Sequence, residues 1–137
     1  YEIASCLVGS EMCIRDSSNA TCAKVNLITG EAYGSAYVFM NSKSVGADLV
    51  YAWSGAKIGA MDSTLAAKIM YPEAGADEIK QKAADYEKLQ DSAASAAARG
   101  YVDRLIDPAD TRKYLVAAFE MLYTKYVSEP EKKHGTK

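Results

Sequence analysis

Short β-rich runs alternate along this chain with segments of helical pattern, and this order constrains the fold more than any single residue does. Four runs are short, apolar or alternating, and rich in β-branched or aromatic residues, so we expect strands there: Lys24–Thr29, Asp48–Trp53, Ala56–Met61 and Tyr101–Ile106. Five segments have helical spacing or composition: Tyr33–Met40, Asp62–Tyr71, Asp77–Leu89, Ser92–Arg99 and a last helix from Asp107. Because Tyr33–Met40 is apolar after its small residues, we expect it to be a buried helix that starts near Gly34. Strands and helices in this order are typical of an α/β domain.

Local end signals support several of these helices. Asp62 or Ser63 can cap the second helix with a side-chain oxygen, and Gly100 suits the C-terminal turn of the fourth. Asp107 followed by Pro108 is a typical start for the last helix. That helix carries an apolar stripe that we expect to face the core: Leu115, Phe119, Leu122 and Tyr126.

Composition excludes several classes of protein. The chain has 137 residues, of which 49% are hydrophobic and 25% charged, a profile of a folded globular domain. Its net charge is −2, so no basic excess indicates nucleic acid. No apolar run approaches the roughly 18 residues of a membrane helix, and no metal-ligand spacing is present. We therefore expect a cytoplasmic protein that binds neither nucleic acid nor a structural metal.

The opening segment differs from the rest. Leu7–Ser17 can be read back, residue for residue, into one DNA string that resembles a transposon-end adapter used in sequencing libraries. We therefore expect residues 1–17 to be non-native and residues 18–137 to be the domain itself. Removing that segment leaves Cys22 as the one cysteine, and the remaining charges sum to zero.

The most informative local site is Tyr33-Gly34-Ser35-Ala36-Tyr37. Small residues at a helix start let a ligand oxygen approach amides that lack partners inside the helix. This arrangement suits stabilisation of an oxyanion, although close packing of helix against strand would select the same residues.

Other candidates are weaker. Ser35 as a nucleophile would need a base, and the choices are the single histidine, His134, or Lys43. Asp48 and Asp62 could form a carboxylate pair, but turns and helix caps also favour Asp. The cationic tail Lys132–His134 could attract phosphate, although a solvated tail would look the same.

Four motifs in order make Ser18–Lys137 resemble the C-terminal end of the biotin-dependent carboxyltransferase family, which includes propionyl-CoA carboxylase β and methylmalonyl-CoA decarboxylase α subunits. The motifs are Glu31–Lys43, Gly46–Trp53, Ala98–Leu115 and Pro130–Gly135. The resemblance implies a crotonase-like ββα superhelix, of which this chain would be the C-terminal part of the carboxyltransferase C-domain.

The resemblance also implies site roles. The family's turn binds the ureido oxygen of biotin through backbone N–H groups, which here fall on Ser35 and Ala36, with Gly34 and Tyr37 as further biotin-binding residues. Val38 falls where relatives shape the acyl pocket. The family commonly has Gly where this chain has Ser35.

The resemblance implies an acyl-CoA substrate, biotin on a carrier protein, partners such as biotin carboxylase or membrane decarboxylase subunits, and a homo-oligomer. Two alternatives stay open at this point. One is a crotonase-like CoA hydratase or isomerase that does not use biotin. The other is a truncated fragment without activity of its own.

Overall fold

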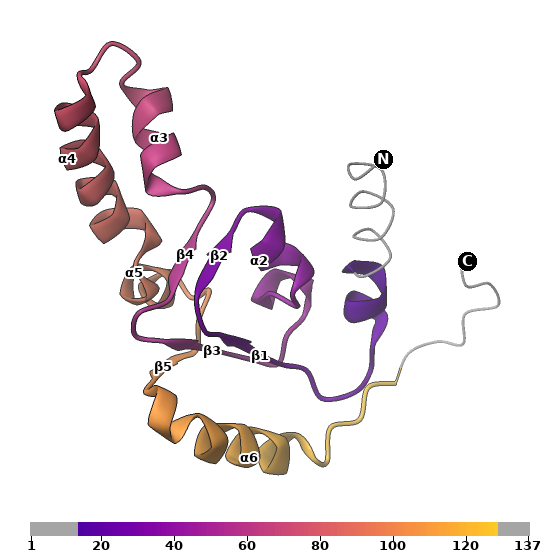
Figure 1. The fold of residues 1–137 in the computed structure, drawn as a ribbon. Helices are drawn as coiled ribbons and strands as arrows, with labels where there is room; N and C mark the ends of the chain where they lie inside the picture. Colours follow the sequence, from indigo (N-terminus) through magenta and orange to yellow (C-terminus); the bar gives the residue numbers. More distant parts are fainter. Residues whose placement is uncertain (1–13, 129–137) are drawn as a thin grey trace, which may run out of the picture.

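The structure, a computed structural model, describes residues 14–128. Residues 14–19 are helical, and the elements that follow are drawn in Figure 1. In chain order they are β1 (Val25–Ile28), β2 (Glu31–Tyr33), α2 (Ser35–Phe39), η1 (Lys43–Val45), β3 (Leu49–Trp53), β4 (Lys57–Gly59), α3 (Ser63–Met70), α4 (Ala76–Tyr86), η2 (Glu87–Asp91), α5 (Ala93–Ala98), β5 (Arg104–Ile106), η3 (Pro108–Asp110) and α6 (Thr111–Leu122).

Two successive ββα units build the described part of the chain. β1, β2 and α2 form the first unit, and β3, β4 and α3 form the second. The first strands of the units join β5 in a parallel sheet of order β1-β3-β5, while β2 and β4 pair as a separate parallel sheet. This repeated ββα arrangement agrees with the expected crotonase-like α/β fold.

The β1-β3-β5 sheet is covered on both faces because β3 alternates its side chains. Val50 and Ala52 are fully buried on one face, against β4 and α5. Tyr51 lies on the other face, in a cluster with Ile106 and Ala118 of α6. The period-2 alternation of a strand thus supplies both layers of the core.

Local signals place several helix ends as expected. The Asp62 carboxylate accepts hydrogen bonds from the amides of Thr64 and Leu65 and so caps α3. Gly100 follows α5 with a φ of 82°, in the left-handed region that favours glycine. The Asp107 side chain, by contrast, makes no capping bond, and Pro108 opens the short 3-10 helix η3 ahead of α6.

Two expectations about burial are wrong. The segment Tyr33–Met40 is not one buried helix: Glu31–Tyr33 is strand β2, and α2 has five residues, none of them buried. The expected stripe of α6 is also not all core, because Phe119 is half-exposed and Tyr126 lies beyond the helix, 87% exposed. Ala118 is the buried residue of α6, so the face that meets the sheet is turned from the one expected.

Two predictions concern the ends of the chain. Residues 14–17 of the opening segment are helical, and the Ser17 carbonyl accepts a hydrogen bond of 2.9 Å from Lys24. The non-native origin of residues 1–17 stays a prediction, and His134 and the basic tail lie outside the described residues. Within residues 14–128, no helix is both long enough and apolar enough to cross a membrane.

Candidate functional site

The turn between β2 and α2 depends on the backbone conformation of Gly34. Gly34 has a φ of 54° and a ψ of −124°, which side-chain-bearing residues rarely adopt. A Cβ at this position would lie 3.0 Å from the Ala60 carbonyl oxygen. The Gly34 amide donates to the Gly59 carbonyl at 2.9 Å. Gly34 therefore gives the turn its shape, and its amide is already used.

The amides that follow Gly34 begin α2. Ser35 and Ala36 are both exposed, and the first amides of a helix have no acceptor within it. A hollow of about 260 Å³ is lined by Ala36, Tyr37 and Met40 of α2 on one side and by the β1–β2 segment on the other, whereas Ser35 does not line it. The turn thus places two exposed residues at the start of α2, one of which, Ala36, lines a small hollow, but Val38 does not line that hollow.

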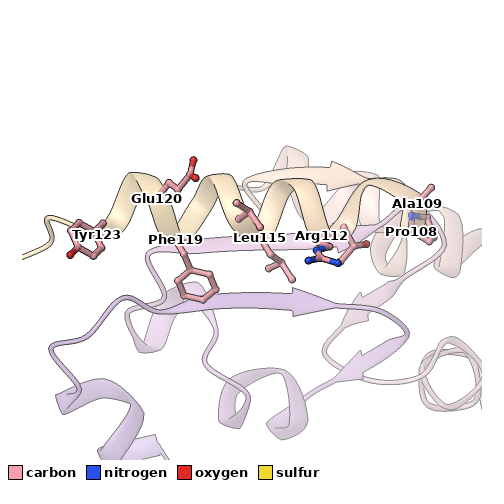
Figure 2. A pocket seen from close by; sticks show the side chains of 9 residues that line it. Pro108, Ala109, Arg112, Leu115, Phe119, Glu120 and Tyr123 are labelled. Carbon is pink, nitrogen blue, oxygen red and sulfur yellow. The ribbon is translucent and has the colours of Figure 1, made fainter.

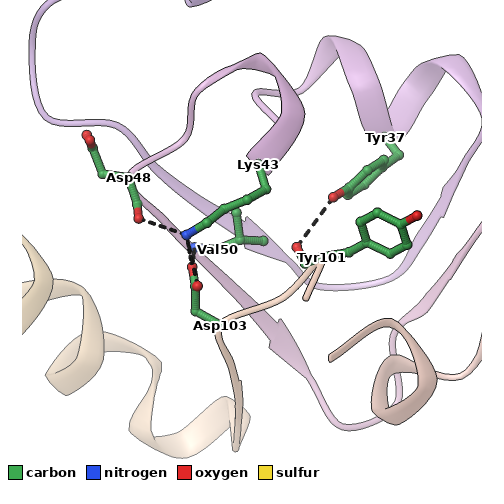
Figure 3. A network of polar contacts seen from close by, with 6 residues as sticks. All are labelled: Tyr37, Lys43, Asp48, Val50, Tyr101 and Asp103. Atoms are coloured by element: carbon green, nitrogen blue, oxygen red, sulfur yellow. Dashed lines mark hydrogen bonds and ion pairs between the residues drawn. The ribbon is translucent and has the colours of Figure 1, made fainter. Parts of the chain in front are cut away.

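Tyr37 ties α2 to the segment between α5 and β5. Its hydroxyl donates to the Tyr101 carbonyl at 3.3 Å, and the two rings meet edge to face with centroids 6.3 Å apart (Figure 3). Burial raises the pKa of the Tyr37 hydroxyl, so the group remains a neutral donor at neutral pH. This contact therefore fixes α2, the helix that Ser35 and Ala36 begin, against the segment between α5 and β5.

An ion pair braces the same region. Lys43 Nζ lies 2.7 Å from Asp103 Oδ2, and it also donates to the Asp48 carbonyl oxygen at 3.1 Å. Asp103 Oδ2 accepts a further bond of 2.8 Å from the Val50 amide (Figure 3). This network joins η1, β3 and the residue that precedes β5.

These contacts remove support from the weaker chemical candidates. Lys43, the base considered for Ser35, is engaged with Asp103. Asp48 and Asp62 do not form a pair, because Asp48 accepts from Lys125 and from the Lys24 amide, whereas Asp62 caps α3.

Sequence reasoning missed two residues behind the turn. Asp91 is fully buried, although an acidic residue in a charged helical segment is expected to face solvent. Its carboxyl lies against Gly59, where an added Cβ would overlap Asp91 Oδ1. A glycine inside a strand run often marks such a close approach, so the run Ala56–Met61 did carry a signal.

An apolar groove lies away from the turn, along α6. It measures about 930 Å³ and is mostly apolar, and Figure 2 shows the side chains that line it. Val116 and Phe119 are half-exposed there, and Tyr123 is 88% exposed. Exposed apolar surface of this kind usually belongs to a contact with other protein, and it offers few polar groups for chemistry.

Comparison with protein families matches residues 7–136 to the carboxyl transferase domain. The putative propionyl-CoA carboxylase beta chain of Bacillus subtilis is 47% identical over 124 residues, which cover 86% of this chain and 24% of that protein. The methylmalonyl-CoA carboxyltransferase 12S subunit of Propionibacterium freudenreichii is 40% identical over 128 residues, with the same two coverages. The chain thus spans about a quarter of the length of these relatives.

Solved structures agree with the sequence comparison. The transcarboxylase 12S crystal structure with methylmalonyl-CoA and methylmalonic acid bound superposes with a TM-score of 0.91 at 36% identity, covering 98% of this chain and 26% of that one. The beta subunit of Pseudomonas aeruginosa geranyl-CoA carboxylase superposes with a TM-score of 0.74 at 20% identity, which supports the fold alone.

Proposed function

The chain belongs to the family of carboxyl transferase domains, and from that membership we propose that it supplies the biotin half-site of an acyl-CoA carboxyltransferase subunit. The observation that carries this proposal is the Gly34 turn, with the exposed residues Ser35 and Ala36 at the start of α2, in a domain of this family. The proposed reaction is transfer of a carboxyl group between biotin and an acyl-CoA. The matched relatives are named as carboxylases, carboxyltransferases and decarboxylases, which favours this reaction over CoA hydration or isomerisation.

The turn fits a ligand that carries a developing negative charge on oxygen. Biotin, when bound, supplies the carboxyl group and a ureido oxygen that gains charge as that group leaves. The amides of Ser35 and Ala36 would donate to this oxygen, with the positive end of the short α2 behind them. Gly34 acts through its shape, because its positive φ sets the direction in which the chain leaves β2 and begins α2.

Side chains around the turn would position it. Tyr37 holds α2 through the Tyr101 carbonyl, so it would keep the donors in place while its ring lines the hollow. We keep Val38 as a residue of the acyl pocket, because it is 36% exposed on α2 and so free to face other protein or substrate. Nothing in this proposal requires the Ser35 hydroxyl to react.

The rest of the activity needs more protein than this chain. The chain covers 24% of the curated relatives, so we propose that the acyl-CoA half-site lies in the remainder of a longer subunit and that this chain alone is inactive. A solved relative is described as a hexamer assembly. We accordingly propose a homo-oligomer in the cytoplasm that works with a biotin carboxyl carrier protein and with biotin carboxylase or membrane decarboxylase subunits.

The test is carried out in a chimera, in which residues 18–137 replace the matching part of the Propionibacterium freudenreichii 12S subunit. Ser35→Pro removes one proposed donor, and we expect carboxyl transfer to fall about 10²–10³-fold, the effect of losing one oxyanion donor. Ser35→Gly and Ser35→Ala keep the amide, so their rates should stay within a few-fold. Carboxyl transfer from carboxybiotin to the acyl-CoA is the measured step.

Binding of acyl-CoA and the melting temperature of each variant serve as controls for folding. If Ser35→Gly folds and binds acyl-CoA yet loses transfer, the hydroxyl itself acts and the backbone assignment is wrong. If Ser35→Pro transfers carboxyl at the normal rate, the turn is not the oxyanion site.

A further inference from the structure

We propose that Asp91 is a positioning residue for the Gly34 turn: its carboxyl group fills the space beneath Gly59 and thereby holds the strand whose carbonyl binds the Gly34 amide. The functional meaning of that turn rests on the function proposed above, but the positioning role itself does not. Asp91 is the last residue of η2 and is buried.

Burial of the Asp91 carboxyl group destabilises the folded protein, so we expect the residue to have a compensating role. The residue is fully buried, and neither carboxyl oxygen has a hydrogen-bond partner among the described residues. A buried polar group without a partner loses its hydration and gains nothing in return. Such groups are rare in folded proteins and often lie at functional positions.

The carboxyl packs directly on the backbone of β4. A Cβ built on Gly59 would overlap Asp91 Oδ1 and would lie 3.0 Å from Asp91 Cγ, so the two residues occupy complementary volumes. Only a glycine at position 59 leaves room for a side chain of this size at position 91. The contact therefore sets how closely η2 approaches the last residue of β4.

Gly59 is also the residue that anchors the turn. Its carbonyl accepts the Gly34 amide at 2.9 Å, and it stands opposite Tyr33 in the parallel register of β2 and β4. Any shift of Gly59 is passed to Gly34 through this bond. Asp91 thus supports, through one residue, the turn that begins α2.

The charged groups around Asp91 favour its neutral form. Burial raises its pKa, and the carboxylates of Asp62 at the start of α3 and Glu87 of η2 raise it further. Lys57 of β4 and Arg99 after α5 oppose them more weakly, and the Tyr33 hydroxyl of β2 also faces the group. A neutral carboxyl is close in shape to a carboxamide, so asparagine should serve in its place.

The experiment measures amide hydrogen exchange by NMR in the chain of 137 residues, with the Tyr51 amide of β3 as an internal reference. In Asp91→Ala we expect the Gly34 amide to exchange at least about tenfold faster relative to Tyr51, because the local opening of the turn becomes easier. In Asp91→Asn the same ratio should stay within about twofold. A purely global loss of stability would speed both amides together and leave the ratio unchanged.

A second pair of variants tests the contact from the other side. Gly59→Ala should also accelerate Gly34 exchange, because the new methyl group collides with Asp91. Gly59→Ala combined with Asp91→Ala should restore the ratio towards wild type, since the methyl group then occupies the vacated space. This pair decides the matter even if Asp91→Ala alone does not fold.

The proposal is overturned if Asp91→Ala leaves the exchange ratio unchanged, if Asp91→Asn raises it as much as Asp91→Ala, or if the double variant shows no recovery. None of these measurements involves biotin or acyl-CoA. A failure of the carboxyl-transfer proposal therefore leaves this test intact, and the reverse also holds.

Discussion

Lys125 Nζ lies 2.8 Å from Asp48 Oδ2 and joins the segment that follows α6 to the residue that precedes β3. The same carboxylate oxygen accepts the Lys24 amide at 2.7 Å, so three segments meet at one acid. Both side chains of the ion pair are largely buried, with exposed fractions of 18% and 20%. This contact is consequently stronger than an ordinary surface ion pair.

Loss of that contact should weaken the attachment of α6. Lys125→Met keeps the aliphatic length of the side chain and removes the charged donor, and we expect the free energy of unfolding to fall by about 1.5–3 kcal/mol. Urea denaturation measures it. Lys80→Met is the matched control, because Lys80 pairs with Asp77 on an exposed surface, and its cost should stay below about 0.5 kcal/mol.

Asp48 should also contribute to acid sensitivity. Burial, the largest influence, raises its pKa, but the hydrogen bonds from Lys125 and the Lys24 amide, together with the positive charges of both lysines, outweigh burial and leave the pKa below the usual 3.8. A carboxylate with a lowered folded-state pKa stabilises the protein above pH 3.8, and that contribution is lost as the pH falls through the lower value. Unfolding measured from pH 6 down to pH 2 should therefore show a smaller acid loss in Asp48→Asn than in wild type.

Asp91 should give the opposite pH dependence. Burial, followed by Asp62 and Glu87, raises its pKa above the usual 3.8, so its neutral form favours folding below that value. The contribution is lost as the pH rises through the folded-state pKa. Asp91→Asn should thus match wild type in stability near pH 3.5 and exceed it increasingly towards pH 8. Equal stability of the two proteins across this range would contradict the assigned neutral state.

Gly34→Ala should destabilise the chain by about 1–3 kcal/mol, because alanine tolerates the observed φ of 54° poorly and its Cβ would meet the Ala60 carbonyl oxygen. Thermal unfolding followed by circular dichroism measures the loss. Gly55→Ala is the control: its Cβ would have no atom within 4 Å, and we expect a change within about 0.5 kcal/mol. Similar effects of the two substitutions would show that the turn is not strained.

The apolar face of α6 should make this chain self-associate. Phe119 and Val116 are half-exposed in the groove along α6, and contiguous apolar surface favours association. Phe119→Lys should lower the apparent mass in light scattering at high concentration, whereas Leu89→Lys, at a single exposed leucine on η2, should not. A monomer of unchanged mass across a wide concentration range would contradict this expectation.

Features that depend on neighbouring residues could be predicted from the sequence. Asp62 caps α3 and Gly100 ends α5, because each signal acts on amides or dihedral angles within a few residues. The α/β class and the resemblance to carboxyltransferases were also readable, since both are carried by the order of local motifs. The family match and the two ββα units confirm them.

Features that depend on residues far apart in the chain could not be predicted from the sequence. Glu31–Tyr33 is a strand only because β4, more than twenty residues later, pairs with it, and so the repeated ββα unit escaped sequence reasoning. The face of α6 that meets the sheet likewise keeps only Leu115 of the expected stripe in the cluster around Tyr51 and Ile106, where Ala118 of α6 is the buried residue.

The candidate site likewise combines features set by local sequence with features set by tertiary contacts. By itself the sequence determined that a glycine and two small residues begin a helix after a strand, because local sterics require them there. Only the tertiary structure decided that the Gly34 amide binds Gly59 and that the acidic residue Asp91 is buried behind it. A period of apolar residues records which side of an element is buried, but the partner of a buried polar group is chosen by packing between segments that are far apart in the chain.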